Sequence, residues 1–118
     1  MSEETTLGRI DVSPRAIASI AARAVLTSYG VVGMAAATLR DGIADILNLE
    51  NVYRGVEVQV LDGQVVIDLY VVIEYGTRIS AVAQNMMESV KFSVEQALAM
   101  PVLEVNVHVQ GVRVSNED

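Results

Sequence analysis

The stretch GVEVQVLDGQVVIDLYVVIEYG, residues 55–76, contains two runs rich in valine and isoleucine that are separated by Asp62-Gly63. An Asp-Gly pair between alternating apolar residues is typical of a two-residue hairpin turn, because both central positions need a positive φ. Such a turn fixes the strand register and places Val60 opposite Val65. We therefore predict a hairpin whose strands share one apolar face, made of Val56, Val58, Val60, Val65, Ile67 and Leu69.

The opposite face of this hairpin mixes acidic and apolar residues, and Val66, Tyr70 and Val72 all lie on it. Contiguous exposed apolar residues usually mark an interaction site. Two interpretations stay open. Either the face is a protein interface that includes Val66, Tyr70, Val72 and the later Arg113, or the N-terminal strand or a short helix packs over it.

A helix with both ends marked precedes the hairpin. Ser13 is a good N-cap, Pro14 suits the first helical position, and Gly30 suits the left-handed residue just past the end. Between them, apolar residues recur at spacings of three and four. Upstream, Gly8–Val12 alternates like a short strand. Residues 1–7 are expected to form a disordered acidic tail.

The sequence Gly30-Val31-Val32-Gly33 raises an alternative function. A Gly-x-x-Gly loop grips the nucleic-acid backbone in KH domains, where it joins two helices. Here the middle residues are valines instead of basic residues, and the stretch VVGMAAAT reads as a strand in which Gly33 allows close packing or a bulge. We favour a helix end followed by a strand. An RNA-binding KH-like module that uses Gly30–Gly33 is the alternative.

The rest of the chain predicts one short helix, one long helix and a final strand. Residues 39–51 form a short amphipathic pattern. Gly76 ends the long strand of the hairpin, and Thr77 is placed to cap a helix that spans 78–100. The stretch VLEVNVHVQ then alternates as a strand, and Gly111 changes the alternation, so we predict a bulge at that glycine.

The order of the predicted elements is β-α-β-(short α)-β-β-α-β. Right-handed crossover connections place both long helices on the same face of one mixed sheet. The predicted fold class is therefore α+β, a two-layer sandwich. A length of 118 residues fits one domain, which we place at residues 8–115 with a short tail at 116–118.

The composition narrows the classes of partner. The formal net charge of −7, from 15 acidic and 8 basic residues, disfavours nucleic acid and anionic lipid, because both are bound mainly through Lys and Arg. No apolar run approaches the ~20 residues of a membrane span, and the acidic start differs from a signal peptide. We expect a cytoplasmic protein with no direct insertion into a membrane.

The sequence contains no catalytic, cofactor-binding or metal-binding motif. It has no cysteine, and no serine lies in a G-x-S-x-G elbow. His108 is the single histidine, and only loosely placed carboxylates such as Glu57 and Asp68 could join it, whereas a metal site needs three or four converging ligands. We therefore expect no enzyme activity, no metal and no cofactor.

Six stretches occur in order between about Gly8 and Ser115: GRIDVS, YGVVGMA, RGVEVQV, IDLYVVIEYGTRIS, VKFSVEQAL and VNVHVQGVRV. Together they resemble the bacterial alkaline shock protein family, also described as envelope stress response proteins. The chain looks closest to the short members encoded beside a fatty-acid kinase. The resemblance implies a non-enzymatic cytoplasmic protein that self-assembles and docks on a small membrane-anchored partner.

Three hypotheses follow from the residues and the resemblance. The first is a homo-oligomeric scaffold or adaptor in envelope stress and lipid homeostasis, brought to the inner face of the membrane by a small membrane-anchored protein or a fatty-acid kinase. The second is RNA binding through Gly30–Gly33. The third is a regulatory module for an enzyme of acyl-lipid metabolism.

Overall fold

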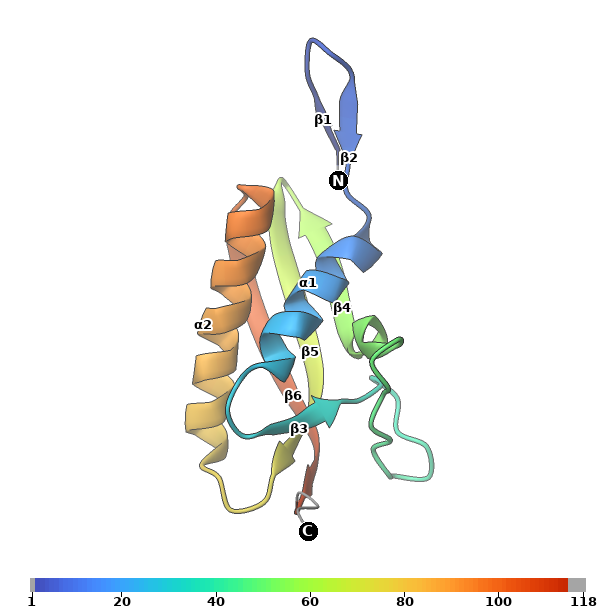
Figure 1. Cartoon of the computed structure of the whole chain (residues 1–118), viewed down its shortest axis with the longest axis vertical. Helices are drawn as coiled ribbons and strands as arrows, with labels where there is room; N and C mark the ends of the chain where they lie inside the picture. The colour runs from blue at the N-terminus through green and yellow to red at the C-terminus, as the bar shows by residue number, and fades with distance from the viewer. Residues whose placement is uncertain (1, 115–118) are drawn as a thin grey trace.

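The computed structural model describes residues 2–114, and Figure 1 labels its helices and strands. In chain order the elements are β1 (Ser2–Glu4), β2 (Arg9–Asp11), α1 (Pro14–Leu26), β3 (Val31–Met34), the 3₁₀ turn η1 (Val52–Gly55), β4 (Val56–Leu61), β5 (Gln64–Glu74), α2 (Ile79–Leu98) and β6 (Val102–Arg113). The predicted domain end at 115 and the tail at 116–118 lie outside the described residues.

The hairpin of β4 and β5 has the predicted register. Asp62 and Gly63 adopt φ values of 49° and 77°, the two positive angles that a type I′ turn requires. Val60 pairs with Val65, and every further pair down to the start of β4 keeps this register. The Asp-Gly turn therefore decides which side chains of the hairpin face the core.

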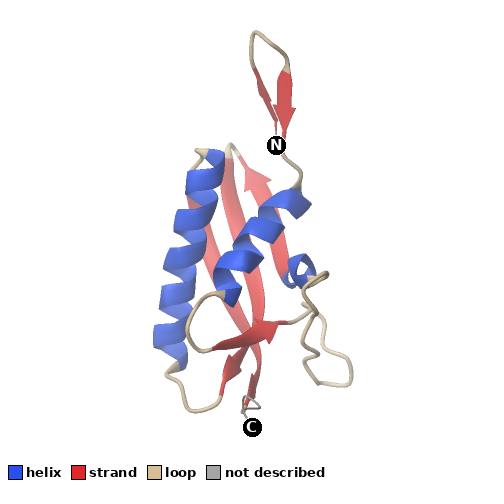
Figure 2. Cartoon of the chain, in the orientation of Figure 1, coloured by secondary structure: helices blue, strands red, loops and turns tan. Residues whose placement is uncertain are grey.

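β5 is the central strand of the main sheet. β6 runs parallel to β5 along one edge, from Val65 to Glu74. The other edge is shared, since β4 pairs with its first part and β3 with its last part, both antiparallel. Both long helices cover the same face of this mixed sheet (Figure 2), so the predicted two-layer α+β fold is confirmed.

The core lies between the helices and the sheet. Alternate residues of β5 from Val65 to Ile73 are fully buried, and α1 contributes mainly alanines, which let the helix approach the sheet closely. Each large aliphatic side chain buried in this way stabilises the fold by about 1.5–3 kcal/mol. The residues that α2 buries are Val82, Met86, Val90 and Val94.

The N-terminal residues differ from the prediction. Residues 2–4 form β1 instead of part of a disordered tail, and β2 pairs with β1 instead of joining the main sheet. All residues of these two strands are exposed. The hairpin projects from the body of the molecule (Figure 1), whose principal extents are 55 × 27 × 26 Å.

The start of α1 is as predicted, but its end is not. The Ser13 Oγ accepts a hydrogen bond from the Ala16 amide at 3.1 Å, and Pro14 is the first helical residue. Thr27 is the C-cap, so the prediction that Gly30 caps this helix is wrong. Gly30 does have a positive φ of 87°, and it uses this angle in the turn before β3.

The turn between β5 and α2 contains a second difference. Gly76 ends the strand as predicted, with a φ of 94°. The N-cap of α2 is Arg78, however, and the prediction of Thr77 as the cap is wrong. The Thr77 hydroxyl donates to the Glu74 carbonyl at 2.7 Å, so it closes the turn behind it.

Residues 35–51 contain no helix, and the predicted short helix is wrong. Asp41 and Gly42 have φ values of 54° and 74°, and the backbone groups of Arg40 and Ile43 hydrogen-bond each other across them. These angles are those of a second Asp-Gly hairpin turn. The segment therefore folds back on itself where a helix would have continued.

β6 continues through the predicted bulge. Its pairing with β5 shifts by one residue between Val109 and Gly111, which confirms the bulge, and the strand then extends to Arg113. A similar shift lies at Leu103, between the pairs of Val102 and Glu104. The pairing between these two shifts, from Glu104 to Val109, is regular.

Two side chains of α2 secure the start of β6. Glu95 Oε2 accepts a hydrogen bond from the Val102 amide at 2.9 Å, and Lys91 Nζ donates to the Val102 carbonyl at 3.2 Å. Lys91 and Glu95 also form an ion pair at 3.6 Å. Both backbone groups of Val102 are thus satisfied from the helix.

Candidate functional site

The sheet face opposite the helices carries four connected side chains, which we call the open-face cluster: Glu57, Asp68, Tyr70 and His108. The Tyr70 hydroxyl donates to Glu57 Oε1 at 3.0 Å, and His108 Nε2 lies 2.9 Å from Asp68 Oδ1. The rings of Tyr70 and His108 are stacked, with centroids 4.6 Å apart and 12° between their planes. The cluster therefore links β4, β5 and β6.

Strand alternation explains how these residues meet. Asp68 and Tyr70 lie two apart on β5 and so share a face. The hairpin register that the Asp-Gly turn fixes places Glu57 opposite Asp68, and the pairing of β6 places His108 opposite Tyr70. The second pairing was missed, because no turn sets the register of two parallel strands joined through a helix.

The environment of the cluster keeps Tyr70 protonated. Burial raises the pKa of the Tyr70 phenol above its usual value, and the hydrogen bond to Glu57 raises it further. The negative charges of Glu57 and Asp68 act in the same direction. Tyr70 is thus held as a hydrogen-bond donor to a carboxylate.

The polar groups of the cluster bind one another. Among residues 2–114, no group of three or more His, Cys, Asp or Glu side chains is placed to hold a metal ion. The Tyr70 hydroxyl and His108 Nε2 are already engaged with carboxylates. The cluster therefore gives this part of the sheet face an acidic and aromatic character.

Two of the predicted contact residues on this face are buried. Val72 is 0% exposed, because Ala35, Ala44 and Val32 pack over it. Val66 is 8% exposed, in the middle of the sheet between β4 and β6. The expectation that Val66 and Val72 contribute to an exposed apolar patch is therefore wrong. Of the alternative, the N-terminal strand does not cover this face, and the segment predicted as a short helix covers Val72 without forming a helix.

Arg113, which the sequence analysis also assigned to protein contact, holds the covering segment in place. Its guanidinium donates to the Ala44 carbonyl. The Gln110 side-chain amide donates to the carbonyls of Ala36 and Ala37 at 3.2 and 2.8 Å. Two side chains at the end of β6 therefore bind the backbone of the segment that buries Val72.

The Gly-x-x-Gly stretch is not an open loop. β3 begins directly after Gly30, so the predicted strand is confirmed. A Cβ atom on Gly33 would lie 2.7 Å from Ile46 Cγ2, and one on Gly30 would lie 2.6 Å from Val82 Cγ2. Both glycines serve close packing, and the stretch leads from α1 into a strand, whereas a KH loop joins two helices.

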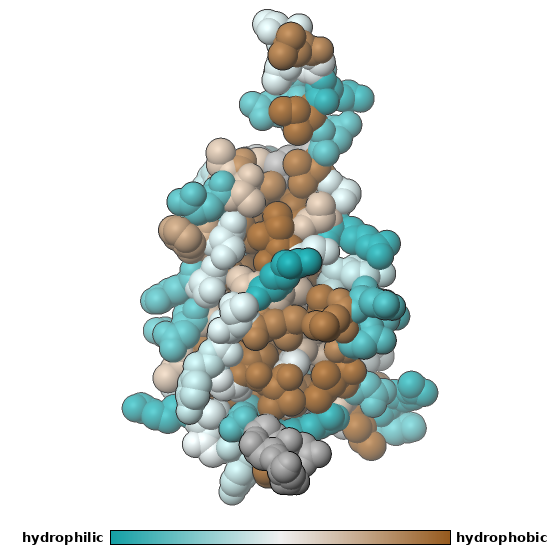
Figure 3. Space-filling view, in the orientation of Figure 1, coloured by the Kyte–Doolittle hydropathy of each residue, from teal (hydrophilic) through white to brown (hydrophobic). Residues whose placement is uncertain are grey.

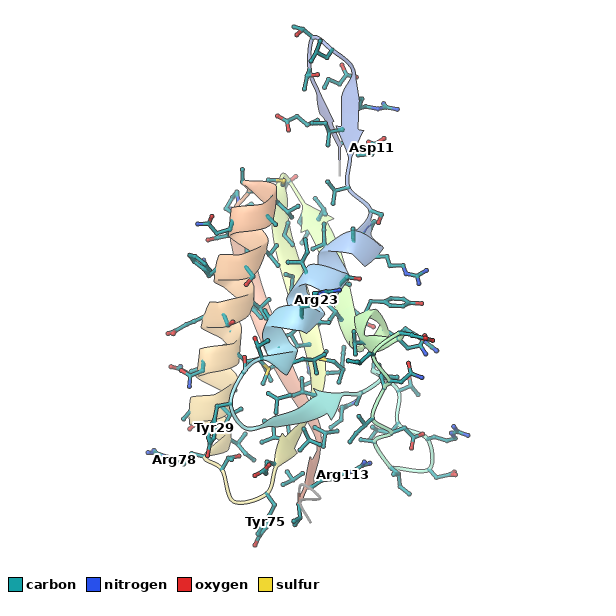
Figure 4. All side chains as sticks on the ribbon, viewed as in Figure 1. Asp11, Arg23, Tyr29, Tyr75, Arg78 and Arg113 are labelled. Atoms are coloured by element: carbon teal, nitrogen blue, oxygen red, sulfur yellow. The ribbon has the colours of Figure 1, made fainter. Side chains whose placement is uncertain are left out.

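The sequence analysis missed an exposed aromatic end of the molecule. Tyr29 lies just before β3 and Tyr75 just after β5, and their exposed fractions are 80% and 71%. The two strand ends meet, because the Gly30 carbonyl accepts a hydrogen bond from the Glu74 amide at 2.8 Å. Figure 4 shows both tyrosines at the end opposite the N-terminal hairpin. In the sequence, the feature that could have indicated this end is the repeated Tyr-Gly pair, Tyr29-Gly30 and Tyr75-Gly76. Both glycines have a positive φ in the structure.

Other exposed apolar residues lie at the same end, where α2 begins and β6 finishes. We call the whole set the Tyr-Gly end: Tyr29, Tyr75, Ile79, Val112 and Val114. The Tyr75 amide donates to the Arg113 carbonyl at 2.8 Å, which ties the end of β6 to this group. On the helix side, Figure 3 also shows apolar residues over α1 and β3, where they form the margin of the core.

Neither helix within residues 2–114 combines the length and hydrophobicity needed to cross a membrane. The longer one, α2, carries charged residues such as Glu88, Lys91 and Glu95 along its exposed side.

Comparison with known proteins gives one family and several relatives. The model of the alkaline shock protein 23 family, described as having a cell envelope-related function, matches residues 2–114. The chain is similar to YloU of Bacillus subtilis (strain 168), with 45% identity over 113 residues that cover 95% of this chain and 94% of the relative. It is also similar to Spy1614 of Streptococcus pyogenes serotype M6, with 37% identity over 112 residues that cover 94% and 93%. Both relatives are described as uncharacterized proteins, and no solved structure matches the chain.

Proposed function

The chain belongs to the alkaline shock protein 23 family, whose function is cell envelope-related, and from this premise we propose that it is a non-catalytic scaffold of the bacterial cell envelope. In this role the protein self-associates in the cytoplasm and docks on a membrane-anchored protein, which brings it to the inner face of the membrane. In this proposal the protein acts in the response to envelope stress and in lipid homeostasis.

The observation that carries this proposal is the Tyr-Gly end. Tyrosine supplies a large apolar ring together with a polar hydroxyl, and it is enriched among the residues that dominate protein interfaces. Tyr29 and Tyr75 each lie next to a strand end, so the sheet holds their backbones in place. Two such rings with three aliphatic neighbours suit an apolar groove on another protein.

The charge of the chain favours a protein partner over lipid. The cytoplasmic leaflet of a membrane is negatively charged, and it repels a chain whose net charge is −7. The membrane anchor is therefore supplied by the partner. A partner with basic residues around its groove would also complement the acidic open-face cluster.

The test is capture of the tagged chain from Bacillus subtilis cells that lack the 45%-identical relative. After cross-linking and solubilisation of membranes, mass spectrometry identifies the bound proteins, and bound RNA is quantified. The wild-type chain should recover a membrane-anchored protein. The double variant Tyr29→Ser/Tyr75→Ser should lose at least about tenfold of that recovery, since interface tyrosines commonly contribute over 1 kcal/mol each.

A matched control is Phe92→Ser, which removes another exposed aromatic ring, 65% exposed on α2, far in sequence from both tyrosines. This variant should recover the anchored protein as well as the wild type does. Equal recovery by the double tyrosine variant would reject the Tyr-Gly end as the docking site. Recovery of RNA alone would reject the scaffold, and recovery of a lipid-pathway enzyme without an anchored protein would assign the chain to regulation of that enzyme.

A further inference from the structure

The outer edge of β6 is the longest unpaired strand edge in the part of the chain that the structure describes. β6 has twelve residues and pairs only with β5 among residues 2–114. Proteins usually protect such edges with bulges, lysines, prolines or covering segments. β6 has a bulge near each end, and Lys91 and Glu95 occupy the backbone groups of Val102. Between the bulges, residues 104–109 form a regular edge with no proline or lysine.

The apolar side of this edge is incompletely buried. Val105, Val107 and Val109 face the core and are only half-buried. Their direct neighbours on β5, Ile67, Leu69 and Val71, are 0% exposed. The difference arises because β5 has a strand on both sides and β6 has a strand on one side. A further strand added at β6 would remove the exposed part of these valines from water.

The sequence of the edge is complementary to itself. Residues 104–108 read Glu-Val-Asn-Val-His, and in antiparallel pairing about Asn106 each Glu104 lies opposite a His108. Val105 lies opposite Val107, and Asn106 lies opposite its own copy. Side chains directly opposite each other point to the same face, so the acid and imidazole meet on the open face and the valines on the helix side.

The His108 ring is held in one orientation on the open face. Its Nε2 is bound to Asp68, and its ring is fixed by stacking on Tyr70. The second ring nitrogen, Nδ1, has no hydrogen-bond partner among residues 2–114. Glu104 is exposed and accepts one hydrogen bond, from the Asn106 amide at 3.3 Å. Nδ1 can donate to an opposing Glu104 when the imidazole carries both protons, one directed at Asp68 and one at Glu104.

We propose that β6 of one copy pairs antiparallel with β6 of a second copy about a two-fold axis through Asn106. The two main sheets then join into one continuous sheet with all four long helices on the same side. A two-fold axis makes each favourable pair occur twice. This inference rests on the proposed function, since it names the surface through which the scaffold self-associates.

Cysteine cross-linking tests the position of the axis. The chain has no cysteine of its own, so Asn106→Cys introduces a single thiol at the two-fold axis. Directly opposed residues of antiparallel strands have Cα atoms about 4.5–5.5 Å apart, a separation that a disulfide spans. Under mild oxidation this variant should form a covalent dimer. Gln59→Cys, which places the thiol on the same sheet face but on β4, should remain mostly monomeric.

Charge exchange tests the self-complementary pairing. In Glu104→Lys homodimers the introduced lysine meets His108, and in His108→Glu homodimers the introduced glutamate meets Glu104. Each variant alone should therefore dimerise at least about tenfold more weakly than the wild type. An equimolar mixture should form heterodimers, because the introduced lysine then meets the introduced glutamate and the native pair forms on the other side of the axis. Glu50→Lys, at an exposed position just before η1, makes the same charge change as the first variant and should not affect dimerisation.

The outcomes separate this inference from the proposed function. Light scattering of the wild type should give a dimer or a larger assembly built from dimers. If the wild type self-associates but Asn106→Cys cross-links no faster than Gln59→Cys, the β6 edge is not the interface. The proposed scaffold function is then unaffected. A strictly monomeric wild type at high concentration would overturn both.

Discussion

Gly30 combines two constraints that no other residue type satisfies together. Its φ of 87° lies in the left-handed region, and an added Cβ would come within 2.6 Å of Val82 Cγ2. Gly63 has a similar φ of 77°, but nothing lies within 4 Å of its Cβ position. The same substitution at these two glycines therefore distinguishes the cost of backbone strain from the cost of overpacking.

We predict that Gly30→Ala lowers the free energy of unfolding by roughly 2–5 kcal/mol, of which 1–2 comes from the left-handed backbone and 1–3 from overpacking. Gly63→Ala should cost only about 1–2 kcal/mol, from the backbone alone. Urea denaturation of both variants measures the difference. Equal losses would contradict the contact between Gly30 and α2.

Tyr70 makes the stability of the protein depend on pH in the alkaline range. Its raised pKa means that the folded chain holds the phenolic proton more tightly than the unfolded chain, so this stabilisation is present below pH ~10 and is lost as the pH rises through the folded pKa. The wild type should therefore lose stability more steeply above pH ~10 than Tyr70→Phe does. Urea unfolding at a series of pH values checks this, and parallel curves over the whole range would refute it.

At the scale of elements, two identical dipeptides were interpreted differently. Asp62-Gly63 lies between alternating valines, and its hairpin register was predictable residue by residue. Asp41-Gly42 lies among apolar residues spaced three and four apart, and this pattern favoured a helix over the same turn chemistry. The structure shows that turn chemistry dominates at both sites, because a segment of this length forms few helical hydrogen bonds to outweigh it.

Gly42→Ala distinguishes the two interpretations by the sign of its effect. A helix over residues 39–51 would gain about 1 kcal/mol of stability from the alanine. In the observed turn, with φ of 74° and open space around the Cβ position, the substitution should instead cost about 1–2 kcal/mol. Equilibrium unfolding gives the answer, and a gain in stability would contradict the turn.

The candidate site was likewise predictable only where it depends on residues that are close in the sequence. Pairing within the hairpin placed Glu57 opposite Asp68 from the sequence alone. The exposure of Val66 and Val72 was not predictable, because it depends on the strands beside Val66 and on a segment about thirty residues away that covers Val72. The placement of Tyr29 and Tyr75 at the same end of the molecule likewise depends on the pairing of β3 with β5.

At the scale of the whole molecule, the N-terminal hairpin is separate from the stability of the body. Its strand residues are all exposed, and an isolated two-stranded hairpin is at best marginally stable in water. Removal of residues 1–11 should therefore change the free energy of unfolding by less than about 1 kcal/mol. In the shortened chain, Ser13→Ala should cost about 1 kcal/mol more, because it removes the cap of α1. A large loss from the deletion alone would show that the hairpin supports the core.

The central position of β5 has a consequence for the order in which the chain folds. Its partner β4 is two residues away along the chain, whereas β3 is separated from it by a long segment and β6 by the whole of α2. Contacts that close short loops form at the lowest entropic cost, so the β4–β5 pairing should be established first on the path to the native state. In stopped-flow measurements, Gly63→Ala should then slow folding, while Val107→Ala in β6 should chiefly accelerate unfolding. The strand that receives every partner in the finished sheet would thus also be the template on which β3 and β6 later assemble.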